Sequence, residues 1–384
     1  MTTSSPQRLV LVGAGHAHVE ILRRFAERPV PGVALSLVVD QVESVYSGMV
    51  PGLVAGDYDF DDVVIPVLPL AARAGAEVFV SPATRVDAAA RLVELADGRR
   101  VHWDVASLDV GSDVRGLQLP GVREHALGTR PIGDFARRLA AALDERSSRT
   151  AGPLRVVVVG GGTAGVELAF TLEARTRRSG SRVSLVCGDE GLLPGAWPAV
   201  GDAVRREAAA RSIAILPGES VRGVDEAGVM LGGVSSDQRD AAVRRLDADL
   251  VVWAAGAAPP GLLAASGLPT DKRGFLRVAP TLEVVGHRGL FAAGDCCAID
   301  GAAWVPKAGV YAVRAGPVLD ANLRSSLGGG SLREYRPQRD FLSLVNLGDR
   351  RALATKWGWA TRGRLAWMLK DRIDRGFVAR YRVG

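Results

Sequence analysis

The clearest hydrophobic pattern lies near the start of the chain. Four apolar residues at 9–12 are followed by the turn Gly13-Ala14-Gly15, and residues 16–25 can then follow as a helix. A short, uninterrupted apolar run is typical of a parallel strand that is buried on both faces. The pattern therefore predicts a strand, a sharp glycine turn and a helix in succession.

This succession suits a dinucleotide-binding unit. The first glycine allows the tight turn, and the second lets the backbone approach a pyrophosphate, which rests on N–H groups at the helix start. His18 takes the place of a third glycine. Residues 33–40 form the next apolar run and end in Asp40, 25 residues after Gly15. This separation is near the roughly 20 residues expected for a carboxylate that bonds an adenosine ribose. We therefore predict a dinucleotide site; the alternative is an ordinary βαβ unit with a glycine turn.

The same pattern returns in the middle of the chain. Four valines at 156–159 precede Gly160, Gly162 and Gly165, which complete the G-x-G-x-x-G spacing, and residues 167–174 continue as a helix. Two such units amount to an internal repeat. This is the layout expected of a chain that binds two dinucleotides.

The second unit departs from the pattern at its acidic residue. Cys187 follows the strand predicted over 184–186, where a ribose-binding acid is expected, and Asp189 comes two residues later. No arginine directly follows this strand to hold a 2′-phosphate, although Arg182 precedes it. We therefore predict that Asp189 substitutes for the acid and that the site favours NAD over NADP.

Two later apolar runs end in small residues. Residues 250–256 are LVVWAAG and residues 289–295 are GLFAAGD, so each predicts a buried strand that enters a tight turn. Glycine lets the chain pass close to a ligand, and Asp295 is placed to accept a bond from a hydroxyl group. A helix is predicted over residues 308–315. A hairpin is predicted at Asp97-Gly98, between two alternating runs.

The composition is that of an ordinary globular protein. Of 384 residues, 47% are hydrophobic and 23% are charged, which allows two or three domains with buried cores. The three cysteines, Cys187, Cys296 and Cys297, form neither a disulfide framework nor a zinc pattern, and no metal site is expected. The N-terminus is polar, and no apolar run approaches the ~18 residues of a membrane-spanning helix, so we expect a cytoplasmic protein.

The net charge of +6 belongs to the C-terminal segment. From residue 351 onward the chain has nine basic residues and two acidic ones. Trp357, Trp359 and Trp367 lie among the basic residues, a combination that suits an anionic membrane surface. The segment predicts either peripheral attachment to the inner membrane face or a homodimer or domain interface. Nucleic-acid binding is not expected, because no nucleic-acid-reading fold surrounds the charge.

Several stretches give the chain a family resemblance. The order of two glycine turns, AAG and AAGD resembles the pyridine nucleotide–disulfide oxidoreductase superfamily, in which type II NADH dehydrogenases and sulfide:quinone reductases are the nearest well-known relatives. The strongest likeness is to the flavoprotein module fused to selenophosphate synthetase. It is carried by VGAGHAHVEILRRF, YSGMVPGLVAGDY, VPKAGVYAVRAGP, YRPQRDFLSLVNLGDR and KDRIDRGFVARY. No synthetase half follows here, so no role in selenium chemistry is expected.

The resemblance implies an α/β fold with two Rossmann-like, three-layer ββα dinucleotide-binding domains, one inserted in the other, and a small C-terminal α+β domain. An FAD-binding domain would comprise residues 1–118 and 249–327. An NAD(P)-binding domain would span residues 119–248. The C-terminal domain, facing a second copy or a membrane, would span residues 328–384.

The resemblance also implies cofactors. FAD would be held at the first glycine turn, through Gly13, Ala14, Gly15 and Asp40, and NAD(P)H at the second. Gly294 and Asp295 would hold the ribityl chain of FAD, and the helix near Ala308 would direct its positive end at the pyrimidine edge of the flavin. His16 and His18 would contact phosphate or flavin, with packing as the alternative for His18.

Electron transfer through a redox cysteine pair beside the flavin is excluded, because residues 46–49 are Tyr-Ser-Gly-Met. The two adjacent cysteines are predicted to be small buried residues. Lys307 would stabilise the reduced flavin or polarise a quinone carbonyl; the alternative is a surface lysine at a helix start. Tyr46 and Met49 would line the acceptor pocket, with core packing as the alternative.

These expectations favour an FAD-dependent enzyme that accepts hydride from NAD(P)H and passes electrons to a quinone or similar small acceptor. Two alternatives stay open. One is an FAD-dependent oxidase or dehydrogenase that acts on an organic or sulfur substrate and has a vestigial NAD site. The other is a non-catalytic flavin-binding assembly protein.

Overall fold

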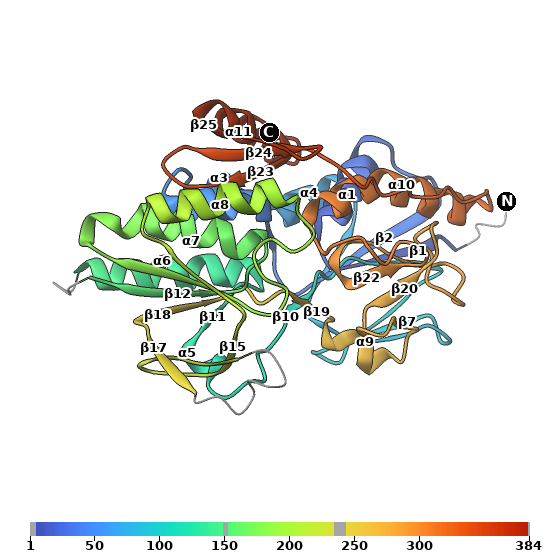
Figure 1. The fold of residues 1–384 in the computed structure, drawn as a ribbon. Helices are drawn as coiled ribbons and strands as arrows, with labels where there is room; N and C mark the ends of the chain where they lie inside the picture. The colour runs from blue at the N-terminus through green and yellow to red at the C-terminus, as the bar shows by residue number, and fades with distance from the viewer. Residues whose placement is uncertain (1–4, 149–152, 234–242, 383–384) are drawn as a thin grey trace.

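Two parallel β-sheets form the centre of the molecule (Figure 1). The structure, a computed structural model, describes residues 5–148, 153–233 and 243–382. The first sheet has the strand order β21-β9-β1-β2-β5, and its neighbouring strands are all parallel. Its strands are β1 (Gln7–Val12), β2 (Val33–Val39), β5 (Glu77–Val80), β9 (Val105–Leu108) and β21 (Leu290–Ala292). The apolar run of β1 is buried, as a central strand covered on both faces requires.

The second sheet repeats this arrangement around the second glycine turn. Its strand order is β11-β18-β12-β13-β14, again parallel throughout. Its strands are β11 (Leu127–Gly128), β12 (Arg155–Val159), β13 (Arg182–Cys187), β14 (Ala214–Pro217) and β18 (Leu250–Trp253). The two strand–turn–helix units predicted from the sequence therefore lie at the centres of two separate sheets.

A three-stranded antiparallel sheet accompanies each parallel one. The first contains β6 (Ala83–Asp87), β7 (Leu92–Leu95) and β8 (Arg100–His102), and the second contains β15 (Glu219–Asp225), β16 (Gly228–Gly233) and β17 (Arg244–Asp247). The hairpin predicted at Asp97-Gly98 is confirmed, because β7 and β8 pair antiparallel on either side of it. The predicted α/β fold class is also confirmed.

Helices complete the layers around both parallel sheets. Helix α1 (His16–Glu27) follows β1 and packs against α4 (Val67–Arg73) and α10 (Gly309–Gly328), while α7 (Thr163–Thr176) follows β12 and packs against α2 (Val50–Ala55). The remaining short strands of the two dinucleotide-binding regions are β3 (Glu43–Val45), β4 (Val64–Pro66), β10 (Asp113–Val114), β19 (Ala257–Ala258), β20 (Leu276–Val278) and β22 (Cys297–Ile299). The remaining helices and turns there are η1 (Ser47–Met49), α3 (Phe60–Val63), α5 (Val122–His125), α6 (Ile132–Ser148), η2 (Arg177–Ser179), α8 (Pro198–Ala210), α9 (Gly261–Ser266) and η4 (Gly294–Cys296).

The chain passes between the two parallel sheets at a short ladder. Strands β10 and β19 pair antiparallel, so the outgoing and returning segments lie side by side. Strand β18 pairs with β12 in the second sheet, although it lies beyond the boundary predicted after residue 248. We therefore propose that the second domain extends as far as β19. The other predicted boundaries stay predictions.

The C-terminal segment forms a small sheet and one helix, drawn in red in Figure 1. Strands β23 (Ser343–Asn346), β24 (Ala352–Lys356) and β25 (Trp359–Gly363) pair antiparallel, and α11 (Arg364–Ala379) follows them. Strand β23 packs against α7, and β25 packs against α8. The segment therefore covers helices of the second sheet.

Helix α11 has a buried side that fixes it to the rest of the molecule. Lys370 and Asp374 are 6% and 4% exposed, and their side chains form an ion pair of 2.7 Å. The ammonium group of Lys370 also donates a hydrogen bond of 2.7 Å to the carbonyl oxygen of Gly48 in η1. A buried pair of this kind leaves an uncompensated charge when one partner is removed.

We expect Lys370→Ala to lower the free energy of unfolding by about 3–5 kcal/mol, because Asp374 would stay buried without its cation. The double variant Lys370→Met/Asp374→Leu should recover most of this loss, since it removes both charges and keeps the side-chain volume. Chemical denaturation followed by circular dichroism measures both effects. A double variant no more stable than Lys370→Ala would contradict the explanation.

Candidate functional site

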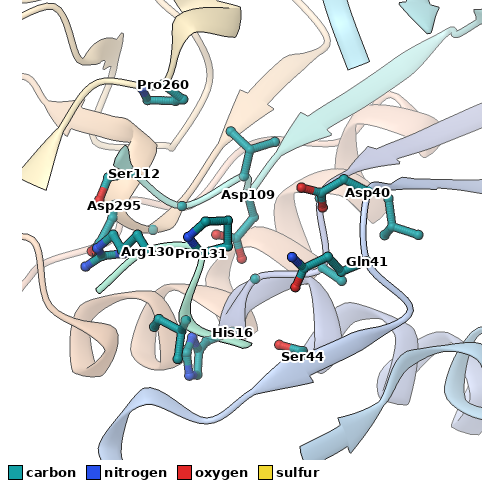
Figure 2. A pocket seen from close by; sticks show the side chains of 18 of the residues that line it. His16, Asp40, Gln41, Ser44, Asp109, Ser112, Arg130, Pro131, Pro260 and Asp295 are labelled. Carbon is teal, nitrogen blue, oxygen red and sulfur yellow. The ribbon is translucent and has the colours of Figure 1, made fainter. Parts of the chain in front are cut away.

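A cavity of about 360 Å³ lies at the carboxyl ends of β1, β2 and β9. Its wall comes mainly from the β1–α1 turn, the end of β2, the loop after β9, the start of α6, and the segments around η4 and the start of α10. Figure 2 shows the side chains of these segments gathered around one space. In open parallel sheets, ligands bind at this edge of the strands.

The β1–α1 turn shapes the cavity because no side chain fits there. Gly13 has a φ of 88°, and a Cβ on it would lie 2.4 Å from the carbonyl oxygen of Asp109. A Cβ on Gly15 would lie 2.3 Å from the carboxyl carbon of Asp109. Gly15 is also the N-cap of α1 and has no side chain to cap the helix. Backbone therefore forms the wall at the positive end of α1.

Three of the carboxyl groups that line the cavity come from different segments. In Figure 2, Asp40 and Asp295 lie on either side of Asp109. Asp40 is exposed at the end of β2, and Asp295 accepts a hydrogen bond of 2.8 Å from Arg130. Asp109 is only 2% exposed, and burial raises its pKa to about 7. The three groups therefore differ in their partners and in access to solvent.

Two buried polar atoms of the wall are left without a protein partner. The Nε2 atom of His16 and the hydroxyl of Ser112 have no hydrogen-bond partner among the residues that the structure describes. Burial lowers the pKa of His16 to about 4, so its ring is neutral at pH 7. Buried polar atoms are rarely left unpaired in folded proteins. These atoms therefore fit a polar ligand that fills the cavity.

The start of α10 forms another part of the wall. Gly309 and Ala312 line the cavity, and Ala308 is the N-cap that precedes them and offers no side-chain cap. The helix runs for 20 residues from this point. Its positive end therefore faces the cavity, where it favours negative charge on a ligand.

The β12–α7 turn resembles the first turn in its use of glycine. A Cβ on Gly160 would lie 2.2 Å from the carbonyl oxygen of Ala254, and a Cβ on Gly165 would lie 1.8 Å from the carbonyl oxygen of Gly160. By contrast, a Cβ on Gly162 would meet no described atom within 4 Å. The outer two glycines are thus required by packing, whereas the middle one lies beside open space.

The end of β13 carries the residues that would contact the ribose of a second dinucleotide. Cys187 is fully buried, and burial raises the pKa of its thiol to about 11, so the thiol is neutral. Asp189 lies on the exposed loop that follows, where its carboxylate accepts the N–H of Glu190 at 3.0 Å. Arg182 begins β13 and therefore lies at the opposite end of the strand. Asp189 therefore places a carboxyl group at this edge, next to Glu190.

A protein-family model described as pyridine nucleotide-disulphide oxidoreductase matches residues 7–316, which include both turns and the cavity. The chain belongs to this family. The cysteines for which the family is named have no counterpart at the cavity: Cys187, Cys296 and Cys297 are all buried and free. The likeness to the module fused to selenophosphate synthetase stays a prediction.

Individual proteins also resemble the chain. The type II NADH:quinone oxidoreductase of Mycobacterium tuberculosis is 24% identical over 362 residues, which cover 87% of this chain and 76% of that protein. The sulfide:quinone oxidoreductase of Aquifex aeolicus has a TM-score of 0.82 at 16% identity, covering 98% of this chain and 91% of that one. The NDH2 of Plasmodium falciparum in complex with NADH has a TM-score of 0.79 at 15% identity, covering 97% and 96%. The chain therefore has the fold of this oxidoreductase family.

Most of the residues predicted for the first site of this family member lie together in the structure. Seven of them line the cavity: Gly13, Ala14, Gly15, His16, Asp40, Gly294 and Asp295. His18 is instead fully buried; its Nδ1 donates to the carbonyl oxygen of Gly13 at 2.7 Å, and its Nε2 accepts from Ser107 at 2.8 Å. Packing, the alternative considered for His18, is therefore what the structure has. The ring fills the space beside the helix and ties the turn to β9.

The residues predicted to line an acceptor pocket lie behind the cavity wall. Met49 is fully buried in the hydrophobic core, which agrees with the alternative of core packing, and its place in an acceptor pocket stays a prediction. The ring of Tyr46 lies 4.4 Å from that of Phe377 and 5.5 Å from that of His16, measured between centroids. Tyr46 therefore supports His16, which itself lines the cavity.

Lys307 is also engaged elsewhere. Its ammonium group donates to the carbonyl oxygen of Cys297 and lies 4.0 Å from the centroid of the Phe275 ring. Burial lowers its pKa. Among the residues that the structure describes, those lining the cavity do not include Lys307. The predicted contact of this lysine with flavin or quinone stays a prediction.

The wall residues that the sequence did not indicate include Asp109, Ser112 and Arg130. One signal was available for the first two. The segment LDVGSD begins at the last residue of a buried strand, so its polar side chains had to lie at the carboxyl edge of the sheet. Arg130 carries no such signal, because it follows only the two-residue strand β11.

We expect Gly165→Ala to destabilise the protein by about 1–3 kcal/mol, because the new Cβ would collide with the carbonyl of Gly160. The matched variant Gly162→Ala has open space and should cost less than about 1 kcal/mol. It should instead weaken NADH binding, since the methyl group would stand where a ligand approaches the backbone. Thermal melts and NADH titrations separate the two effects; equal melting temperatures would contradict this assignment.

Proposed function

We propose that the protein is an FAD-dependent oxidoreductase that accepts hydride from NAD(P)H and passes the electrons to a quinone or similar small acceptor. The observation that carries this proposal is the pair of glycine turns, each at the carboxyl edge of its own parallel sheet in one chain. When bound, FAD supplies the ring that accepts the hydride and later releases the electrons. The relative named type II NADH:quinone oxidoreductase supports the choice of donor and acceptor.

The residues of the first cavity suit FAD. The turn from Gly13 to Gly15 would approach the pyrophosphate, Asp40 would bond the adenosine ribose, and Asp295 the ribityl chain. The unpartnered atoms of His16 and Ser112 would gain hydrogen bonds. The positive end of α10 would stabilise negative charge on the flavin.

The second turn suits NAD(P)H. Gly162 leaves room for the backbone to meet a pyrophosphate, while Gly160 and Gly165 set the shape of the turn. We favour NAD over NADP, because Asp189 offers a carboxylate at the edge where the ribose would lie, and Arg182 lies at the other end of β13. A carboxylate there repels a 2′-phosphate.

The outer side of α11 and β25 suits a membrane surface, which would deliver a lipid-soluble quinone. Trp359 and Leu365 are 82% and 81% exposed, and Arg364 and Arg372 are exposed on the same helix. The other exposed apolar residues of this face are Trp357, Met368, Leu369 and Ile373. No helix in the described residues is long and apolar enough to cross a membrane. We therefore propose peripheral attachment at the inner membrane face, with a homodimer interface as the alternative.

We expect the purified protein to carry FAD whose absorbance band bleaches on anaerobic addition of NADH, with NADPH less effective. Adding a soluble quinone should restore the band, because the electrons would leave to the acceptor. Spectra recorded under argon test both steps.

Two other outcomes would decide against this proposal. A flavin that dithionite reduces but neither coenzyme does would favour the oxidase or dehydrogenase with a vestigial NAD site. A flavin that NADH bleaches and that no quinone, dye or oxygen reoxidises would favour the assembly protein.

Membrane attachment predicts that Leu365→Glu weakens binding to anionic vesicles by about tenfold or more, because burial of a leucine side chain contributes about 1.5–3 kcal/mol. Val243→Glu is the matched control, since Val243 is 59% exposed just before β17, away from α11. Vesicle sedimentation measures both variants. Equal pelleting of Leu365→Glu and wild type, with a dimer–monomer shift in solution, would favour the homodimer.

A further inference from the structure

Asp109 holds a carboxyl group at the positive end of α1. Its Oδ2 accepts the backbone N–H groups of Ala17 at 2.8 Å and of His18 at 3.2 Å. Its own carbonyl oxygen accepts the N–H of Gly15 at 3.1 Å. The first N–H groups of such a helix are the ones that attract a pyrophosphate. The protein therefore has a carboxyl group of its own at the position where the negatively charged pyrophosphate of a dinucleotide would bind.

Packing holds this carboxyl group in place. A Cβ on Gly15 would lie 2.3 Å from its carbon, and a Cβ on Gly294 would lie 2.3 Å from its Oδ1. The group therefore sits between two backbone segments and cannot turn away without moving one of them. Ser112, three residues later, is 8% exposed and its hydroxyl lacks a described partner, so the adjoining wall is also built for a polar ligand.

We propose that Asp109 takes up a proton from solvent when the pyrophosphate of FAD enters the cavity, so that the affinity for FAD falls as the pH rises above neutrality. This inference rests on the proposed function, because it takes FAD as the ligand of the first cavity. Two phosphates repel an ionised carboxylate in a poorly hydrated place, whereas they do not repel a protonated carboxyl group.

The sign of the effect follows from the burial of Asp109. Burial raises its pKa to about 7, and neighbouring phosphates would raise it further. Below pH 7 the group is protonated with or without FAD, so the affinity does not change with pH. Above pH 7 binding takes up one proton, and the dissociation constant rises by up to about tenfold per pH unit.

The groups around Asp109 do not produce this dependence. They come from α1, from η4 and from the segment before α6: His16, His18, Asp295, Cys296 and Arg130. Burial lowers the pKa of both histidines to about 4, and the hydrogen bond with Cys297, with burial, raises the pKa of the Cys296 thiol. Asp295 is paired with Arg130. Asp109 is therefore the group whose charge changes just above pH 7.

The test measures release of FAD from the diluted holoenzyme between pH 6 and pH 9, followed by the fluorescence of free FAD. The dissociation constant of FAD from the wild-type protein should not change with pH up to about pH 7 and should rise above that pH. Asp109→Asn keeps an oxygen for the two N–H groups but cannot ionise, so its constant should stay flat and lie about tenfold below wild type at pH 8. Asp202→Asn, at an exposed position of α8 outside this wall, is the control and should keep the wild-type slope.

The profile of the wild type alone tests the proposal, so it does not depend on the folding of a variant. A wild-type constant that is the same at pH 6 and pH 9, or a slope that persists in Asp109→Asn, would overturn the proposal and leave the proposed function standing. A protein that binds no FAD at any pH would overturn both.

Discussion

The carboxyl ends of β1 and β9 approach each other and η4 so closely that only glycine fits at three positions between them. A side chain on Gly13, Gly15 or Gly294 would collide with the backbone or the carboxyl group of Asp109. The floor of the cavity is therefore made of backbone, and the start of α1 lies directly above it. Everything else at the site depends on this contact, since it sets where the helix begins and how near a ligand can come.

The contact also explains which parts of the site could be predicted from sequence. Some features of the site are formed by residues that are close together in the chain, and these can be recognised from the sequence alone. They are the apolar run of β1, the glycine spacing and the carboxylate that follows β2. The end of a buried strand marks Asp109 for the carboxyl edge of a sheet, but its place beside the glycine turn depends on the register of β9, which sets Leu108 beside Val12, almost a hundred residues away in the chain. The role of His18 has the same origin, because its partner Ser107 lies on β9.

Helix α11 shows a second limit of sequence-based prediction. Asp371 and Arg375 are four residues apart and pair at 2.9 Å towards solvent. Lys370 and Asp374 have the same spacing and opposite charges, yet they are buried against Gly48. Spacing cannot distinguish the two pairs, because burial depends on the elements against which the helix packs. For the same reason the sequence did not indicate that Lys307 lies beside the carbonyl of Cys297 and the ring of Phe275.

Helix α11 contacts the cavity wall through its inner side and faces solvent with its outer side. On the inner side, Phe377 packs against Tyr46, and Tyr46 packs against His16, whose unpartnered nitrogen belongs to the cavity wall. On the outer side, Leu365 and its apolar neighbours face solvent. At a rise of about 1.5 Å per residue, the stretch from Leu365 to Phe377 spans about 18 Å along the helix, whereas the exposed Ile373 is one turn away from Phe377. The C-terminal half of α11 is therefore where its exposed apolar face and its ring contacts with the cavity wall come nearest to each other.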